Sequence, residues 1–253
     1  MQNNPNSDLN GEYIHRINKV LDYIDSNITG DLSLDTLSNV ANFSSYHFHR
    51  IFSAMMGEPL SKYIKRIRLE KAALILVSNS NYPIGEIASM CGFDNQSSFS
   101  RAFQIHFSFS ASELRKDKSL IESKKCKTDS KMGKDDLKSL PYSGVVAHVA
   151  SENYPPVVKP LGIEVTVISE MTVAYIRVIG TFNGEKEVFQ KAIARLLRWT
   201  EIRDLIHFPE TKILSLYHDH PDVTDDANLR TSLCITVPEH TRVNGEIGKM
   251  MIP

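Results

Sequence analysis

The feature that most constrains this chain is a repeat within its first half. Residues 37–43 (LSNVANF) match residues 87–93 (IASMCGF) at an offset of 50, and residues 48–52 (FHRIF) match residues 99–103 (FSRAF) at an offset of 51. One residue has therefore been added between the matching segments of the second copy. Each copy combines a short helical pattern, a turn and a second helical pattern, so the sequence predicts two consecutive helix-turn-helix blocks.

Residues that favour helix ends flank these patterns at the expected positions: Ser33, Ser44, Gly57, Pro83 and either Asp94 or Asn95. Serine, aspartate and asparagine cap helix N-termini, glycine ends helices, and proline fits the first turn. Between the blocks, residues 60–78 are predicted to form one long helix, and residues 11–26 an opening helix. The front of the chain is thus expected to be all-α.

The second helix of a helix-turn-helix lies in the major groove, and its exposed face meets base edges. Arginine and glutamine can form paired hydrogen bonds with purines, and serine and tyrosine suit bases or phosphates. The predicted base-reading residues are Tyr46, His49 and Arg50 in the first block and Gln96, Ser97, Ser100 and Arg101 in the second. The predicted phosphate contacts are Ser45, Lys62, Lys65, Arg66 and Asn95. For each lysine the alternative is a solvated helix face, and for Arg68 the alternative is a structural role that ties the two blocks together.

The length of the joining helix suggests how the two blocks meet DNA. A helix of about 19 residues is roughly 28 Å long at ~1.5 Å per residue, whereas one turn of B-DNA is about 34 Å. We therefore expect a monomer to reach two successive major grooves of one duplex. DNA would bend if the two recognition helices stand closer than one turn.

The front of the chain resembles the DNA-binding domain of the AraC/XylS family of bacterial transcription regulators. The run from Leu32 to Lys116 matches without gaps, and its strongest stretches are IGEIA at 84–88, Gly92-Phe93 and SFSRAF at 98–103. The resemblance implies a homeodomain-like double helix-turn-helix with the reading residues given above. The chain departs from the family at Ser108, Ala111 and Leu114, where glycine, proline and an aromatic residue are usual. This departure concerns how the last turn closes.

The back of the chain is predicted to be a separate α+β domain. Lysine, serine, aspartate and proline dominate residues 119–160, which is typical of a linker, with one short strand possible at 145–149. Beyond it we expect strands at 163–168, 173–178, 213–217 and 229–237 and a helix at 188–206. The predicted domains are 8–116 (DNA-binding), 117–160 (linker) and 161–253 (effector-binding).

This second region resembles the first half of a GyrI-like effector-binding domain. The matching pieces are YHDHPD at 217–222 and LCITVP at 233–238. In that family two halves form one cup around an apolar, often cationic, ligand, so we expect a small-molecule effector and a chain that is a fragment holding only about the first half. Trp199 and Tyr217 are the aromatic candidates for a pocket wall; core packing is the alternative, favoured for Trp199 and about equally weighted for Tyr217.

Composition and motifs limit the other classes of function. The formal net charge of −1 is only a weak indication of DNA binding, so the prediction rests on where the charges sit. The three cysteines form no disulfide framework, and a signal peptide and membrane span are not expected, which favours the cytosol. His218 and His220 with Asp219 and Asp222 look like a metal cluster, but a polar loop is the preferred interpretation.

Together these patterns predict a cytoplasmic, sequence-specific transcription regulator rather than an enzyme, without metal or cofactor. Double-stranded DNA and a small-molecule effector are the expected partners, with RNA polymerase a further candidate. The alternative is a small-molecule-binding or hydrolase-like GyrI domain protein in which DNA binding is secondary. No phosphate-binding loop, nucleophile elbow or catalytic carboxylate pair supports an enzyme.

Overall fold

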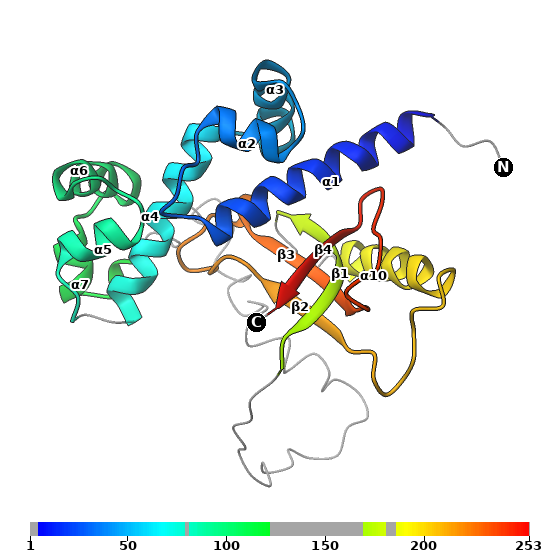
Figure 1. The fold of residues 1–253 in the computed structure, drawn as a ribbon. Helices are drawn as coiled ribbons and strands as arrows, with labels where there is room; N and C mark the ends of the chain where they lie inside the picture. The colour runs from blue at the N-terminus through cyan, green and yellow to red at the C-terminus, as the bar shows by residue number, and fades with distance from the viewer. Residues whose placement is uncertain (1–4, 79–80, 122–168, 181–185, 253) are drawn as a thin grey trace, which may run out of the picture.

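The predicted repeat is visible in the arrangement of the helices. The computed structural model describes residues 5–78, 81–121, 169–180 and 186–252. Helix α4 (Leu60–Ser78) separates one pair of helices, α2 (Leu34–Val40) and α3 (Ser45–Met56), from a second pair, α5 (Ile84–Met90) and α6 (Gln96–Phe107) (Figure 1). Helix α1 (Pro5–Ser26) precedes the first pair and begins earlier than predicted, and α7 (Ala111–Lys116) follows the second.

The helix ends follow from the capping residues. The side chains of Ser33, Ser44 and Asn95 accept hydrogen bonds from the backbone N–H groups of Thr36, His47 and Ser98. These contacts satisfy donors that a helix N-terminus otherwise leaves unpaired. Gly57 ends α3 in the left-handed conformation, as predicted. Pro83 lies one position before the first turn of α5, at its N-cap.

The last turn of the helical module closes without the expected glycine. Ser108 takes the left-handed conformation (φ 67°) at the end of α6. Ser110 and Glu113 then form a capping box that starts α7, because each side chain accepts the backbone N–H of the other. Ala111 and Leu114 bury their side chains in the adjoining core. The departure from the family pattern therefore leaves the C-terminal helix in place.

Each helix-turn-helix block has its own hydrophobic core. Apolar residues of α1, Phe48 and Phe52 of α3, and the first half of α4 form one core. Phe99 and Phe103 of α6, α5, α7 and the second half of α4 form the other. Since α4 contributes to both cores, it fixes the distance between the two blocks.

Arg68 and Gly92 join the two blocks at the middle of α4. The Arg68 Nε donates to the carbonyl oxygen of Ile28, 3.0 Å away, in the loop after α1. Gly92, in the turn of the second block, has φ +79°, and a Cβ built on it would lie 2.6 Å from the Ile28 oxygen and 2.8 Å from the Arg68 guanidinium. This confirms that Arg68 ties the blocks together and explains why a glycine stands at the turn.

The C-terminal region is an α+β layer. Its described strands are β1 (Met171–Ile179), β2 (Ile213–Tyr217), β3 (Arg230–Thr236) and β4 (Gly248–Ile252). They form an antiparallel sheet in the order β2-β3-β1-β4. Strands β1, β2 and β3 match the prediction closely, whereas β4 was not predicted. The predicted strands at 145–149 and 163–168 and most of the predicted linker lie outside the described residues.

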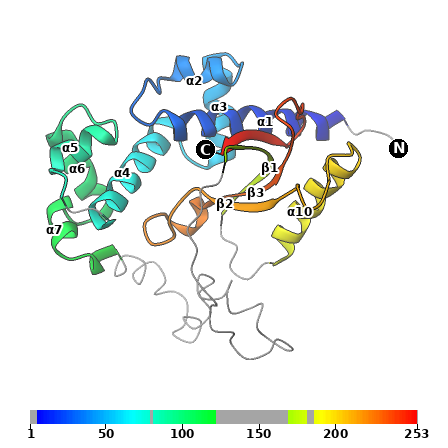
Figure 2. The same ribbon diagram turned by 60° about the horizontal axis from the view of Figure 1, so that its bottom comes forward.

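The two faces of this sheet are covered by different parts of the chain. Helix α10 (Lys186–Glu201), which ends before the predicted residue 206, packs through Ala192 and Leu196 on the face that carries Ile176 and Ile235. Helix α1 of the DNA-binding module lies over the opposite face (Figure 2). On that face Tyr175 lies across Gly248 of β4, where any side chain would collide with the Tyr175 ring.

A buried arginine forms the centre of the contact between the two modules. Arg230 of β3 is 3% exposed, and its Nη1 donates to both carboxylate oxygens of Asp25 in α1 (3.1 and 3.0 Å) and to the Tyr63 hydroxyl in α4 (2.9 Å). Its Nε and Nη2 donate to the two carboxylate oxygens of Asp219 at 2.9 and 2.7 Å. One guanidinium therefore connects the sheet to two helices of the DNA-binding module.

A second arginine repeats the contact on the neighbouring strand. The Arg177 Nη2 donates to Asp22 of α1 at 2.7 Å, and the Tyr175 hydroxyl donates to the same carboxylate at 2.6 Å. Arg177 Nη2 also lies 3.3 Å from the His218 Nε2. Because a guanidinium only donates, that nitrogen must accept, which places the ring proton on Nδ1. Burial, and then the charges of Arg177 and Arg230, lower the pKa of His218 to about 2, so the ring is neutral.

Arg66 of α4 lies in the same junction, which corrects the expectation that it contacts phosphate. Its side chain is 6% exposed and pairs with Glu58 at 2.7 Å and with Glu70 at 3.2 Å. Glu70 in turn accepts a hydrogen bond from Thr224 of the C-terminal region at 2.9 Å. Burial raises the pKa of Glu70 to about 7 against the opposing effect of Arg66. A buried, fully paired arginine has no free face to offer DNA.

We predict that Gly92→Ala destabilises the protein much more than Gly57→Ala. Both glycines have positive φ, but a Cβ at Gly57 meets nothing within 4 Å, whereas one at Gly92 meets backbone. Backbone strain should cost about 1 kcal/mol at Gly57, and strain plus the collision about 2–4 kcal/mol at Gly92. Urea unfolding followed by circular dichroism measures both. Equal losses would show that the approach of Ile28 to the turn is unimportant.

We also predict energetic coupling between Asp25 and Arg230. In a double-mutant cycle built from Asp25→Ala and Arg230→Ala, the two losses of unfolding free energy should differ from additivity by about 1–3 kcal/mol, because either change removes the same contact. Glu113→Ala, in the capping box of α7, is the matched control and should be additive with Arg230→Ala within about 0.5 kcal/mol. Additivity in the first cycle would mean that the modules are not held together by this pair.

Candidate nucleic-acid interface

The exposed face of α3 presents the predicted reading residues of the first block. Phe48 and Phe52 are buried on the opposite side of the helix, so this face points to solvent. Tyr46 is 75% exposed, and the Arg50 guanidinium lies 5.7 Å from the centre of its ring. His49 is exposed beside them. The three side chains thus form one outward surface, in which Arg50 can donate in pairs and Tyr46 offers a hydroxyl and an aromatic face.

Two neighbours of this surface have structural partners. The Ser45 hydroxyl donates to Asp35 of α2 at 2.8 Å and lies 3.2 Å from the Ser38 hydroxyl, so it ties the two helices of the block together. His47 packs against Phe43 and Tyr13. His47 therefore faces α1 and His49 faces outward, and within the described residues no group of three potential metal ligands is found.

The exposed face of α6 presents the reading residues of the second block. Gln96, Ser97, Ser100 and Arg101 are exposed, while Phe99 is buried on the opposite side. A Cβ built on Gly85 of α5 would lie 2.9 Å from the Gln96 side-chain oxygen, so the absence of a side chain at Gly85 makes room for Gln96. The Asn95 side-chain oxygen accepts the Ser98 N–H at 2.8 Å. That oxygen is therefore used in capping.

The same face of α6 continues past the residues predicted from the sequence. Gln104 and Ile105 are exposed and follow Arg101 by three and four positions, so they share its side of the helix. Ile105 is 77% exposed, which is unusual for an isoleucine in a helix with a buried opposite face. The helical period could have identified this position. Phe99, Phe103 and Phe107 recur every four residues on the buried face, and Ile105 lies off that spacing.

Helix α4 exposes its lysines to solvent. Lys62, Lys65 and Lys71 are exposed, and in the described part of the chain Lys62 and Lys65 form no ion pair. Tyr63, Arg66 and Glu70 lie on the side that meets the C-terminal region. Two of the three predicted phosphate contacts in this helix therefore stay available.

The two aromatic residues predicted to line a pocket, Trp199 and Tyr217, have different neighbours. Trp199 of α10 packs against the core between helix and sheet, its Nε1 donates to Asn244 at 3.2 Å, and the Arg203 guanidinium lies 4.5 Å from its ring centre. Tyr217 is 52% exposed on the edge strand β2, paired with Thr231. Neither side chain lines the two cavities beside α1.

The four histidine and aspartate residues at 218–222 lie in two different environments. His218 is partly buried in the junction with its Nε2 2.8 Å from the Ser232 hydroxyl, and Asp219 binds Arg230. His220 and Asp222 stay half exposed, 3.6 Å apart. The junction could not be predicted from the sequence, because the residues that bond across it are 153 to 205 positions apart along the chain. Among the helices that the structure describes, none combines the length and apolarity needed to span a membrane.

Comparison with known proteins agrees with this division of the chain. A family model described as a helix-turn-helix domain matches residues 37–117. A second model, described as a GyrI-like small molecule binding domain, matches residues 163–253. The two matches cover the two modules described above.

Several bacterial proteins are similar to about two fifths of the chain. The transcriptional activator AarP of Providencia stuartii is 34% identical over 99 residues, which are 39% of this chain and 73% of that protein. The Transposon Tn10 TetD protein of Escherichia coli is 37% identical over 102 residues, 40% and 73% of the two chains. The multiple antibiotic resistance protein MarA of Salmonella typhimurium is 33% identical over 91 residues, 36% and 71%.

The matched helix-turn-helix model covers both helices that carry the exposed reading faces, and one of these relatives is named as a transcriptional activator. The chain belongs to the AraC family of DNA-binding transcription regulators and joins its helix-turn-helix module to a GyrI-like effector-binding domain.

Proposed function

We propose that this protein reads a two-part DNA site through α3 and α6 and that a small molecule bound by the C-terminal region modulates this binding. The observation that carries the proposal is the pair of exposed faces at the two ends of α4. Each combines an arginine with hydroxyl or amide side chains, which is the chemistry that reads base edges in the major groove.

The shared helix supports simultaneous reading of two grooves. Both cores include residues of α4, so the two recognition helices cannot move apart without disrupting packed phenylalanines. Arg68 and Gly92 further restrain the turn of the second block. A rigid spacer shorter than one turn of DNA favours bending of the duplex toward the protein. Lys62 and Lys65 would contact the phosphates between the two reading faces.

The junction supports a route from effector to DNA. Arg177 and Arg230 contact α1, Arg230 also contacts α4 through Tyr63, and Thr224 contacts it through Glu70. A ligand that prefers one arrangement of the sheet relative to these helices shifts the population toward it. One relative is named as a transcriptional activator, which supports RNA polymerase as a further partner.

We predict that Arg50→Ala and Arg101→Ala each lower specific DNA affinity by roughly 5- to 150-fold, the equivalent of about 1–3 kcal/mol per lost bidentate contact. Each variant should lose selectivity at different base pairs, because the two residues lie on different recognition helices. Selection of binding sites from random duplexes, followed by fluorescence anisotropy, measures both effects. Arg198→Ala, exposed on α10, is the matched control. Unchanged affinity and selectivity in both variants would exclude these residues as readers.

We predict a different signature for Lys62→Gln and Lys65→Gln. Each should weaken binding to all duplexes alike and reduce the slope of log affinity against log salt by about 1, since one phosphate contact is lost. Lys191→Gln, exposed on α10, should leave the slope unchanged. A slope unaffected by the α4 substitutions would show that the two lysines are merely solvated.

A further inference from the structure

A continuous groove runs along α1 where the two modules meet. Two adjoining cavities, of about 390 and 200 Å³, lie between α1 and the loop that joins β3 to β4. His15, Lys19 and Val243 line both cavities, so they are parts of one groove. The larger cavity falls within the range of about 300–1,000 Å³ that small-molecule sites occupy.

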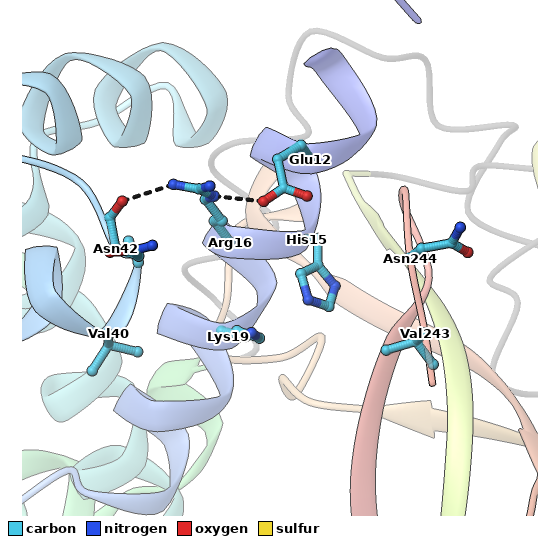
Figure 3. Close-up of a pocket in the computed structure, with 9 residues that line it drawn as sticks. Glu12, His15, Arg16, Lys19, Val40, Asn42, Val243 and Asn244 are labelled. Carbon is cyan, nitrogen blue, oxygen red and sulfur yellow. Dashed lines mark hydrogen bonds and ion pairs between the residues drawn. The ribbon is translucent and has the colours of Figure 1, made fainter. Parts of the chain in front are cut away.

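The groove touches the first helix-turn-helix directly. Val40, the last residue of α2, and Ala41 and Asn42 of the turn that follows line the smaller cavity opposite Val243 and Asn244 of the C-terminal loop (Figure 3). The Arg16 Nη1 donates to the Asn42 carbonyl oxygen at 2.7 Å across this end. An occupant would therefore contact α1, the turn that precedes a recognition helix, and the C-terminal region at once.

The charges that line the groove are unbalanced. Its acids are already neutralised: Glu12 pairs with Arg16 at 2.7 Å, and Asp22 pairs with Arg177 at 2.7 Å. Within the described residues, the lining cations Lys19 and Arg242 form no ion pair. These two side chains, from α1 and from the C-terminal loop, leave net positive charge facing the larger cavity.

Other lining groups hold the wall in position. Lys249 donates to the carbonyl oxygens of Glu239 and Thr241 at 2.8 and 3.1 Å and so fixes the loop that carries Arg242. The His15 Nδ1 lies 3.1 Å from the Ile247 carbonyl oxygen, which can only accept. The Nδ1 of His15 is therefore the donor in this contact. Lys19 and Arg242 are the groups left to meet a ligand.

We infer that this groove binds a small organic anion, with a carboxylate or phosphate held between Lys19 and Arg242 and an apolar body against Val243. The inference rests on the proposed function, because it names the effector class and its position. It differs from the expectation of a cationic ligand in a cup of the effector domain. Binding here would couple ligand to DNA through the turn before α3 as well as through the sheet.

Small anions and a matched cation test the inference on the full-length protein without DNA. Benzoate and phenyl phosphate should shift backbone amide resonances of α1 and residues 240–249, whereas benzylammonium should not. Lys19→Gln combined with Arg242→Gln should weaken anion binding at least tenfold, and Lys19→Arg combined with Arg242→Lys should preserve it. Lys191→Gln combined with Arg198→Gln, on α10, is the control for surface charge and should leave binding unchanged. The relative affinity of the two anions shows whether carboxylate or phosphate is preferred.

Three results would overturn the inference. The first is no resonance shift at roughly 10 mM anion, where even fragment-sized ligands bind a genuine site. The second is equal binding of benzylammonium. The third is loss of DNA affinity in the Lys19 and Arg242 variants without any anion present, which would assign the groove to the DNA backbone. Failure of the proposed function is a separate outcome, because it appears as absence of selective DNA binding by the unmodified protein.

Discussion

The arrangement of the two modules depends on one buried guanidinium. Arg230 cannot leave its site without stranding Asp219, whose side chain is 4% exposed, and Asp25. Leaving buried carboxylates unpaired is costly, whereas an intact pair contributes mainly to specificity of geometry. The contact therefore fixes where the sheet lies on α1 and α4 more than how stable either module is. Each module builds a hydrophobic core mainly from its own residues, and Val223 of the C-terminal region joins the core of the second block.

Helix α1 has a double role that follows from this geometry. Its apolar residues Ile17, Leu21 and Ile24 are buried against the first helix-turn-helix, while Asp22 and Asp25, on another face, bind the arginines of the sheet. A shift of the sheet would therefore also move α1, which belongs to the core of the DNA-binding module. The groove lies along this same helix, so a ligand there and a ligand in the sheet would act on one element.

Much of the front of the chain could be predicted from the sequence, and less of the back. Ser33, Ser44, Asn95 and Gly57 act as helix ends because capping is a local interaction. Arg66 was assigned wrongly because a charged residue on an otherwise polar helix face indicates solvent, and only the second module reveals that this face is covered. Strand β4 was missed because Gly248 and Lys249 interrupt the apolar pattern. Gly248 is explained by Tyr175, which lies more than 70 positions earlier and is brought close by strand pairing.

The distance along the chain between the partners at the junction has a consequence for how the protein is made. Asp25 and Arg230 are 205 residues apart, whereas the helices of the front module pair mostly with near neighbours. Domains generally fold as units, the N-terminal one first during synthesis. The DNA-binding module therefore leaves the ribosome and packs while the strand that carries Arg230 has yet to be translated. For that interval the chain is a DNA-binding module without its sensor, with the acids of α1 open to water.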